Sequence, residues 1–215
     1  MASIPLKPQY GPSLGRLLAP RWRRASRPVR LLALVLGAAF VALALAAVLS
    51  FENAEYSHGG PAPFSFGYRD LYRAPSPAGA YVQVRRPASG PPVDSFTVYP
   101  LHLPAYAGSP NAVLPVYADA YIAALRRRTG SFRLLGEGKT RVNTVPGYDV
   151  LYTARVRGRT MYGRDVLLLP ERSRPRDGVI ISMLSLPGAD PSVDSPLLVG
   201  TTGVLELPVE TFTIH

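Results

Sequence analysis

The stretch GEGKT, residues 136–140, contains the residue types of a phosphate-binding loop. In such a loop, backbone amides and a lysine hold the phosphates, and a glycine stands five positions before the Gly-Lys pair. Counting back five from Gly138 gives Arg133, and the chain that follows runs into a Pro-Gly pair instead of opening a helix. The sequence therefore excludes a nucleotide-binding loop. It predicts a strand that kinks at its glycines, because glycine often marks a bulge.

Residue types that serve nucleophilic, acid–base or metal chemistry form no catalytic set elsewhere in the chain. The absence of cysteine excludes thiolate catalysis and cysteine-ligated metals, and no G-x-S-x-G motif marks a nucleophilic serine. Of the histidines, His58 lies in the expected stalk and His215 is the last residue of the chain, which leaves His102 as the one in the interior of the expected domain. Asp190 and Asp194 could bind calcium, but an EF-hand loop needs closer oxygen ligands and a terminal glutamate, so we interpret them as turn residues. We therefore predict a protein that is not an enzyme and has no metal or cofactor.

Arginines gather in two places that could contact an acidic partner. Three follow one another at the end of a predicted helix, and others surround one predicted hairpin, where Arg164 adds a further charge. The competing interpretation is a solvated helix end, favoured by the helix dipole, and a solvated sheet surface. The candidate basic contact surface consists of Arg126, Arg127, Arg128, Arg155, Arg157 and Arg159.

The positive charge of the whole chain is concentrated at its N-terminus. The chain has 24 basic and 14 acidic residues, for a net charge of +10, and residues 1–30 contain seven of the basic residues and none of the acidic ones. The rest is close to neutral, so we expect no nucleic-acid partner. Residues 1–30 are rich in proline and arginine with little apolar periodicity, which predicts a disordered basic tail. Its arginines would contact anionic lipid headgroups.

An uncharged apolar stretch, residues 31–51, follows the tail. At helical rise it is about 31 Å long, the thickness of a bilayer core. A cleaved signal peptide is the alternative, but its apolar region would be shorter and would end at a small-x-small site, which residues 51–54 do not provide. We predict an uncleaved signal anchor, a single transmembrane helix in the plasma membrane of a bacterium. The positive-inside rule places residues 1–30 in the cytoplasm and residues 52–215 outside it.

The exported part begins with a polar segment, residues 52–63, which we interpret as a stalk before a domain over residues 64–215. An apolar stripe at helical spacing, starting near Pro115 and ending before Gly130, predicts one amphipathic helix. The sequence also predicts turns at Pro146-Gly147 and at Arg157-Gly158-Arg159. Predicted strands cover residues 64–68, 80–87, 94–104, 132–142, 148–157, 160–170, 178–187 and 209–214, with a short helix and turn within 195–208.

These elements predict an α+β domain, an antiparallel sheet with helical cover. Strands, then one helix, then a meander reading VPGYDVLYTARVRGRTMYGRDVLLLP resemble the PsbP-like domains over roughly residues 80–214. Gly147-Tyr148 and Arg157-Gly158-Arg159 occupy positions of the family pattern, and Thr211 replaces the serine of its closing strand. The resemblance implies an α/β/α sandwich, found in photosystem accessory proteins, a nuclear import factor and bacterial envelope proteins of the DcrB and LpqN type. The lipoproteins' lipid-attachment cysteine is absent, and the family implies no shared catalytic residues.

Three functional hypotheses follow. The first is a non-enzymatic, membrane-anchored domain that binds a partner protein or a small ligand at the bacterial cell envelope. The second is an extracytoplasmic, hydrolase-like enzyme with a site near His102, Tyr99 and Tyr106. In the third, the outer domain is a sensor that signals to the basic cytoplasmic tail.

Overall fold

The computed structural model describes residues 26–49, 53–87, 89–170 and 176–215, and the chain divides into two compact units, Met1–Glu52 and Asn53–His215. The described part of the first unit is the helix α2, Arg27–Leu49. No helix within the described ranges is long and apolar enough to cross a membrane. The transmembrane helix over residues 31–51 therefore stays a prediction, and most of the predicted tail lies outside the described residues.

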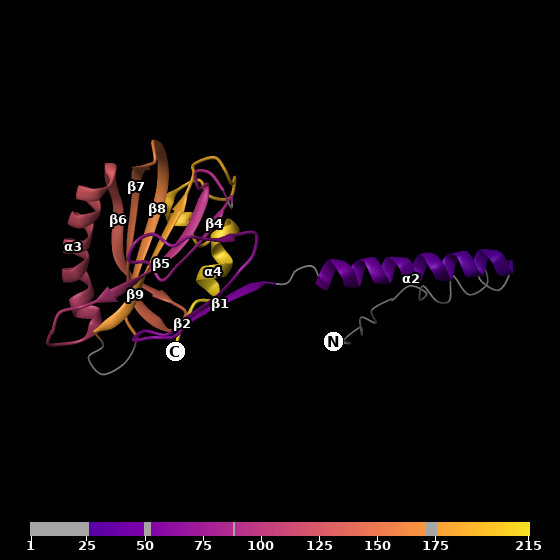
Figure 1. The fold of residues 1–215 in the computed structure, drawn as a ribbon, viewed down its shortest axis with the longest axis horizontal. Coiled ribbons are helices and arrows are strands. Elements are labelled where there is room, and N and C mark those ends of the chain that lie inside the picture. Colours follow the sequence, from indigo (N-terminus) through magenta and orange to yellow (C-terminus); the bar gives the residue numbers. More distant parts are fainter. Residues whose placement is uncertain (1–25, 50–52, 88, 171–175) are drawn as a thin grey trace, which may run out of the picture. The chain divides into compact units, whose positions relative to one another are not determined.

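The second unit is built on a seven-stranded antiparallel sheet with the order β3-β4-β5-β9-β8-β7-β6 (Figure 1). Its last four strands along the chain, β6 to β9, form the predicted meander. The predicted strands at residues 80–87 and 94–104 are β4 and β5, and β5 pairs with β9. The strands are β3 Tyr72–Ala74, β4 Val82–Arg86, β5 Asp94–His102, β6 Gly130–Val142, β7 Val145–Val156, β8 Arg159–Leu168 and β9 Asp177–Ser185.

One face of this sheet is covered by α3, Pro110–Arg128, which packs on β6 and β7 (Figure 1). The predicted apolar stripe is its buried side, formed by Leu114, Ala118, Ile122 and Leu125. The helix starts earlier than predicted, so that its second proline lies inside it and not in its first turn. The reason is an earlier start signal, a serine at the N-cap followed by proline. At the other end, Thr129 is the C-cap, and the next residue already begins β6.

The opposite face is covered by a three-stranded sheet with the order β1-β2-β10 and by short helices. Four phenylalanines form the centre of this core, with Phe66 and Phe96 ring centroids 4.8 Å apart and those of Phe64 and Phe212 5.4 Å apart. The elements are β1 Ala54–His58, β2 Phe64–Tyr68, η1 Pro196–Leu198, η2 Gly203–Leu205, α4 Glu206–Glu210 and β10 Thr213–Ile214.

Two predictions at the ends of this unit are corrected. Residues 54–58, assigned to a stalk, form β1 and pair along their whole length with β2. The predicted strand over residues 209–214 is reduced to β10, because residues 206–210 are helical. Both errors concern segments whose conformation depends on contacts distant in the sequence.

The turns of the meander are partly as predicted. Arg157 and Gly158 form a two-residue hairpin turn with φ of 51° and 81°, the left-handed values that a type I′ turn requires. Pro146-Gly147 is not a turn, since both residues lie inside β7, and the chain reverses at Asn143, whose φ is 52°. Asparagine tolerates this conformation. The GEGKT stretch lies in a strand, as predicted, but the register shift of β6 falls just before it, between Leu134 and Gly136, and both Gly136 and Gly138 pair regularly with β7.

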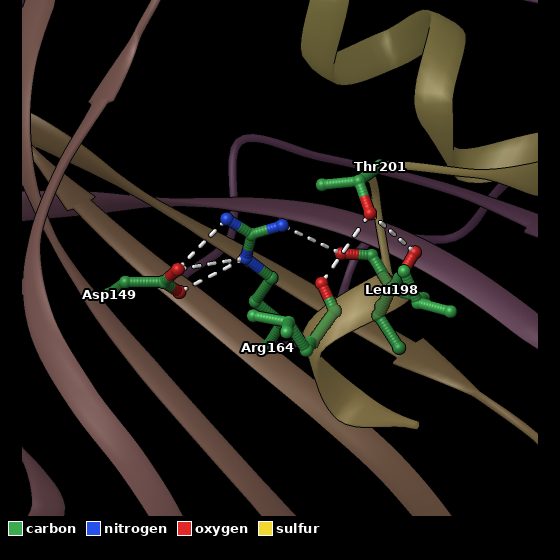
Figure 2. A network of polar contacts seen from close by, with 6 residues as sticks. Asp149, Arg164, Leu198 and Thr201 are labelled. Carbon is green, nitrogen blue, oxygen red and sulfur yellow. Dashed lines mark hydrogen bonds and ion pairs between the residues drawn. The ribbon is translucent and has the colours of Figure 1, made fainter. Parts of the chain in front are cut away.

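Arg164 forms a bidentate ion pair within the sheet and also connects the sheet to the covering segment of residues 195–202 (Figure 2). The Arg164 Nη2 and Asp149 Oδ2 atoms lie 2.8 Å apart, and the Arg164 Nη1 donates a hydrogen bond of 3.1 Å to the Val199 carbonyl. Thr201 closes the turn by donating to the Leu198 carbonyl at 3.1 Å. Arg164 is therefore not part of a solvated basic surface, as the sequence suggested, but an internal connection between two layers.

Candidate functional site

A row of polar residues crosses the sheet on the face that α3 covers. Gln83 is the cross-strand partner of Thr97, Thr97 of Ser182, and Ser182 of Asp165. Directly paired residues project from the same face of a sheet. Val150, the cross-strand partner of Asp165, packs in the same core cluster as the buried side of α3. The row therefore lies on the sheet face that α3 covers. Gln83 Nε2 donates to the Thr97 hydroxyl at 3.0 Å, so the row is connected at its outer end.

Asp165 is the centre of this row and is completely buried. The Tyr121 hydroxyl donates to its Oδ2 at 2.7 Å and the Tyr152 hydroxyl to its Oδ1 at 3.2 Å, and Ser182 also hydrogen-bonds to it. Burial raises the pKa of the Asp165 carboxyl from 3.8 to about 6, although these hydrogen bonds and the positive charge of Arg128 act in the opposite direction. The carboxylate is thus solvated by three hydroxyl groups instead of water.

A glycine opposite Tyr152 makes room for its ring. Gly163 is the cross-strand partner of Tyr152, and a Cβ atom at Gly163 would lie 2.3 Å from the ring carbons. The Tyr152 ring also stacks with the Phe132 ring, and the two ring centroids are 5.2 Å apart. The missing side chain at Gly163 therefore lets the ring lie over the neighbouring strand.

Directly outside Tyr121 the surface is hollowed. A hollow of about 270 Å³ is lined by Tyr99, Tyr117, Tyr121, Arg128 and three further residues, Gly79, Pro100 and Ile180. The Arg128 guanidinium stands over the Tyr121 ring, 5.7 Å from its centroid, and its Nη2 donates to the Tyr121 hydroxyl at 3.5 Å. Burial, followed by the negative charge of Asp165, holds the pKa of Tyr121 well above 10. Tyr121 therefore stays neutral and connects the hollow to the buried carboxylate.

A second hollow, of about 530 Å³, opens on the same face nearer the edge of the sheet. Gln83 and Arg85 line it, and they alternate along β4 with valines of the opposite core. Arg157, from the β7–β8 turn, also lines it, while Arg85 Nη1 donates to the Gly90 carbonyl at 2.9 Å. The connection between β3 and β4 lies beside both hollows, with Pro75 at the second and Gly79 at the first.

The six arginines of the predicted contact surface are distributed over several environments. Arg128 lines the first hollow and Arg157 the second, while Arg127 is exposed on the helix. Arg126 lies 5.8 Å from the Phe132 centroid. Arg155 and Arg159 lie on opposite faces of the hairpin. Arg155 pairs with Thr160 and Arg159 with Val156, and successive cross-strand pairs project from opposite faces. Of these six arginines, two therefore line a hollow: Arg128 from the helix end and Arg157 from the hairpin.

The site suggested around His102 is not assembled. His102 Nδ1 lies 2.6 Å from Asp177 Oδ1, and both side chains are exposed. Tyr99 is three residues away on the same strand, so it projects from the other face, where it lines the first hollow. Tyr106 packs against the core cluster under α3.

Of the two aspartates considered for calcium, Asp190 is explained by turn geometry. Asp190 Oδ1 accepts hydrogen bonds from the backbone amide and the hydroxyl of Ser192, at 2.9 and 2.7 Å, and these bonds lower its pKa. Across the described parts of the chain, no group of three acidic or histidine side chains could hold a metal ion.

Asp165, Tyr152 and Ser182 were not singled out from the sequence. The available signal was the position of Asp165 in β8, where GRDVLLLP places a charged residue on the inward side of an apolar strand. A carboxylate at such a position needs partners from other elements, which marks it for attention.

No family model matches the sequence, and neither does any curated protein. Among solved structures, the chain is similar to cyanobacterial PsbP (CyanoP) from Synechocystis, with a TM-score of 0.50 and 10% identity over 76% of this chain and 92% of that one. LpqN, involved in cell envelope biogenesis of Mycobacterium tuberculosis, has a TM-score of 0.49 and 13% identity over 78% and 94%. The fold is PsbP-like, as the sequence resemblance predicted. At these identities the likeness concerns the fold alone.

Proposed function

We propose that this chain is a membrane-anchored, extracytoplasmic binding domain of the bacterial cell envelope, and that it takes up a small ligand at the hollowed face of its seven-stranded sheet. The observation that carries the proposal is the pair of hollows on the sheet face that α3 partly covers, which together combine aromatic rings, guanidinium groups and hydroxyl donors. Concave sites with an apolar lining and a few directed polar groups are typical of small-molecule binding.

A binding function fits the way in which the reactive groups are held. Asp165 has the perturbed pKa often found in active sites, but the carboxyl is fully buried behind Tyr121, so that a substrate in the hollow would meet a phenol and not the carboxylate. The pair formed by His102 and Asp177 lies at the exposed end of β5 and lines neither hollow. Both arrangements favour binding over turnover.

The membrane anchor and the orientation are supported by the sequence. Residues 31–51 contain no charged side chain, and all seven charges of residues 1–30 are positive. The helix α2 covers most of the apolar stretch. Anionic headgroups at the cytoplasmic side would attract the tail, and the sheet domain would be displayed outside the cytoplasm.

The orientation can be tested because the natural chain contains no cysteine. We expect a membrane-impermeant thiol reagent to label Leu197→Cys, at a position that is 60% exposed, in spheroplasts from which any outer barrier has been removed. Ser13→Cys should be labelled only after the membrane is permeabilised. Labelling of Ser13→Cys in intact spheroplasts would contradict the orientation.

The binding proposal is tested with the full chain in detergent micelles, carrying ¹³C-labelled tyrosine rings. A fragment library with neutral, cationic and anionic members should contain compounds that shift the signals of Tyr99 and Tyr117. The signals of Tyr56 and Tyr68, which pack on the opposite core cluster, should stay unchanged and serve as internal controls. The proposal fails if no fragment shifts the tyrosines of the hollow, or if purified protein turns a fragment over.

A further inference from the structure

We propose that the hollow lined by Tyr99, Tyr117, Tyr121 and Arg128 is a binding site for a small aromatic carboxylic acid, whose carboxylate pairs with Arg128 and whose ring packs among the tyrosines. This inference rests on the proposed function and names the ligand class of one of its two hollows. It is carried by the charge, the lining and the size of the hollow.

The charge of the hollow comes from one guanidinium. Arg128 is the charged side chain among the lining residues, and no ion pair joins it to a carboxylate elsewhere in the described chain. Its contacts are with Tyr121, through the ring face and a long hydrogen bond of 3.5 Å. Arg128 is exposed to solvent. A planar guanidinium matches a carboxylate through two parallel hydrogen bonds.

The rest of the lining favours a flat apolar body. Tyr99 and Tyr117 contribute two aromatic side chains besides Tyr121, and Pro100 and Ile180 add aliphatic surface. Aromatic pairs prefer offset-stacked or edge-to-face contacts. At about 270 Å³ the hollow lies just below the range of drug-sized sites, which suits a single ring with one carboxylate.

The buried carboxylate behind Tyr121 makes this binding depend on pH. Asp165 is faced by Tyr121 and Arg128 from α3, by Tyr152 from β7 and by Ser182 from β9. On β5, burial raises the pKa of Tyr99, and the Asp165 charge acts in the same direction. When Asp165 is ionised, its negative charge partly cancels that of Arg128 and opposes a second anion. Its protonation, with a pKa of about 6, removes this opposition. Affinity for a carboxylate should therefore rise roughly threefold to tenfold from pH 7.5 to pH 5.

The test is a titration of the full chain, in the same labelled micelles, with benzoate and with its neutral counterpart benzamide. We expect benzoate to shift the signals of Tyr99 and Tyr117 and benzamide to bind at least tenfold more weakly. Arg128→Ala should weaken benzoate binding at least tenfold. Arg127→Ala, at an exposed position that lines neither hollow, should bind as the wild type does. In Asp165→Asn the pH dependence should disappear.

The following results would overturn the inference. Equal affinity for benzoate and benzamide would remove the role of the charge, and equal loss in the two arginine variants would remove the role of this guanidinium. Tighter binding of inorganic phosphate than of benzoate would show that the ligand class is wrong. If neutral fragments shift the same tyrosines while benzoate does not, only this inference fails. If no compound shifts them, the proposed function fails as well.

Discussion

The ionisation of Asp165 should make the stability of this protein depend on pH in a way that one substitution removes. The carboxyl has a pKa of about 6 when folded and 3.8 as an ordinary aspartate. At 1.36 kcal/mol for each pH unit, the difference corresponds to about 3 kcal/mol. Because the folded-state pKa is raised, stability is fully present below pH 3.8 and is lost as the pH rises through 6. Asp165→Asn keeps the shape of the side chain but cannot ionise.

We therefore expect the free energy of unfolding of Asp165→Asn, relative to the wild type, to increase by about 2 kcal/mol between pH 4.5 and pH 8. The measurement is urea unfolding of both proteins at a series of pH values, in detergent micelles, followed by near-ultraviolet circular dichroism of the tyrosines. All tyrosines except Tyr10 lie in residues 53–215, so the signal reports on the sheet unit. Other groups titrate equally in the two proteins and cancel in the difference.

A difference in unfolding free energy that is constant with pH would refute this reasoning. It would mean that Asp165 has an ordinary pKa in the folded protein, and that water or a further positive charge reaches it. A pH-independent loss of stability in the variant, in addition to the expected slope, would measure the hydrogen bonds from Tyr121 and Tyr152, each worth about 1 kcal/mol. The slope with pH and the offset are therefore separate results of one experiment.

Three other substitutions test the packing around the site and the hairpin. Gly163→Ala should lower the unfolding free energy by about 1–3 kcal/mol, because its Cβ would overlap the Tyr152 ring; unchanged urea midpoints would contradict this. Arg164→Met should lower the unfolding free energy by about 3–5 kcal/mol, because it leaves Asp149 buried without its cation. The double variant with Asp149→Asn should recover part of this loss in the same urea assay. Gly158→Ala should cost about 1 kcal/mol, because φ at this position is 81°, which thermal unfolding would detect.

The elements that sequence reasoning predicted well are those whose signals are local. The two-residue turn at Arg157 and Gly158 follows from turn chemistry, and the glycines of β6 correctly indicated an irregularity nearby, although the register shift falls just before Gly136. The start of α3 was missed because proline at residue 115 suggested a first turn, whereas the Ser-Pro pair at 109–110 provides the actual one. Prediction was best where neighbouring residues determine the conformation.

The remaining errors and the site itself depend on contacts that no local pattern contains. Residues 54–58 are polar and mostly exposed, so only their pairing with β2 makes them a strand. The bond from Tyr121 to Asp165 joins residues 44 positions apart. It exists because α3 packs on β6 and β7 with Tyr121 directed toward β8. The helix stripe and the strand were both predicted, but their docking was not.

The two buried aspartates of the meander show why Asp165 needs a functional explanation. On one face of the sheet, Asp149 is compensated by the bidentate guanidinium of Arg164, 2.8 Å away. On the other face, Asp165 has hydroxyl donors but, among the described residues, no cation within 4.0 Å. The hydroxyl groups offset only part of the cost of burying its charge, because burial raises the pKa of Asp165 to about 6 while their hydrogen bonds lower it. A neutral side chain would avoid this cost, and the proposed binding site gives the charge a role, because in the adjacent hollow it opposes the positive charge of Arg128.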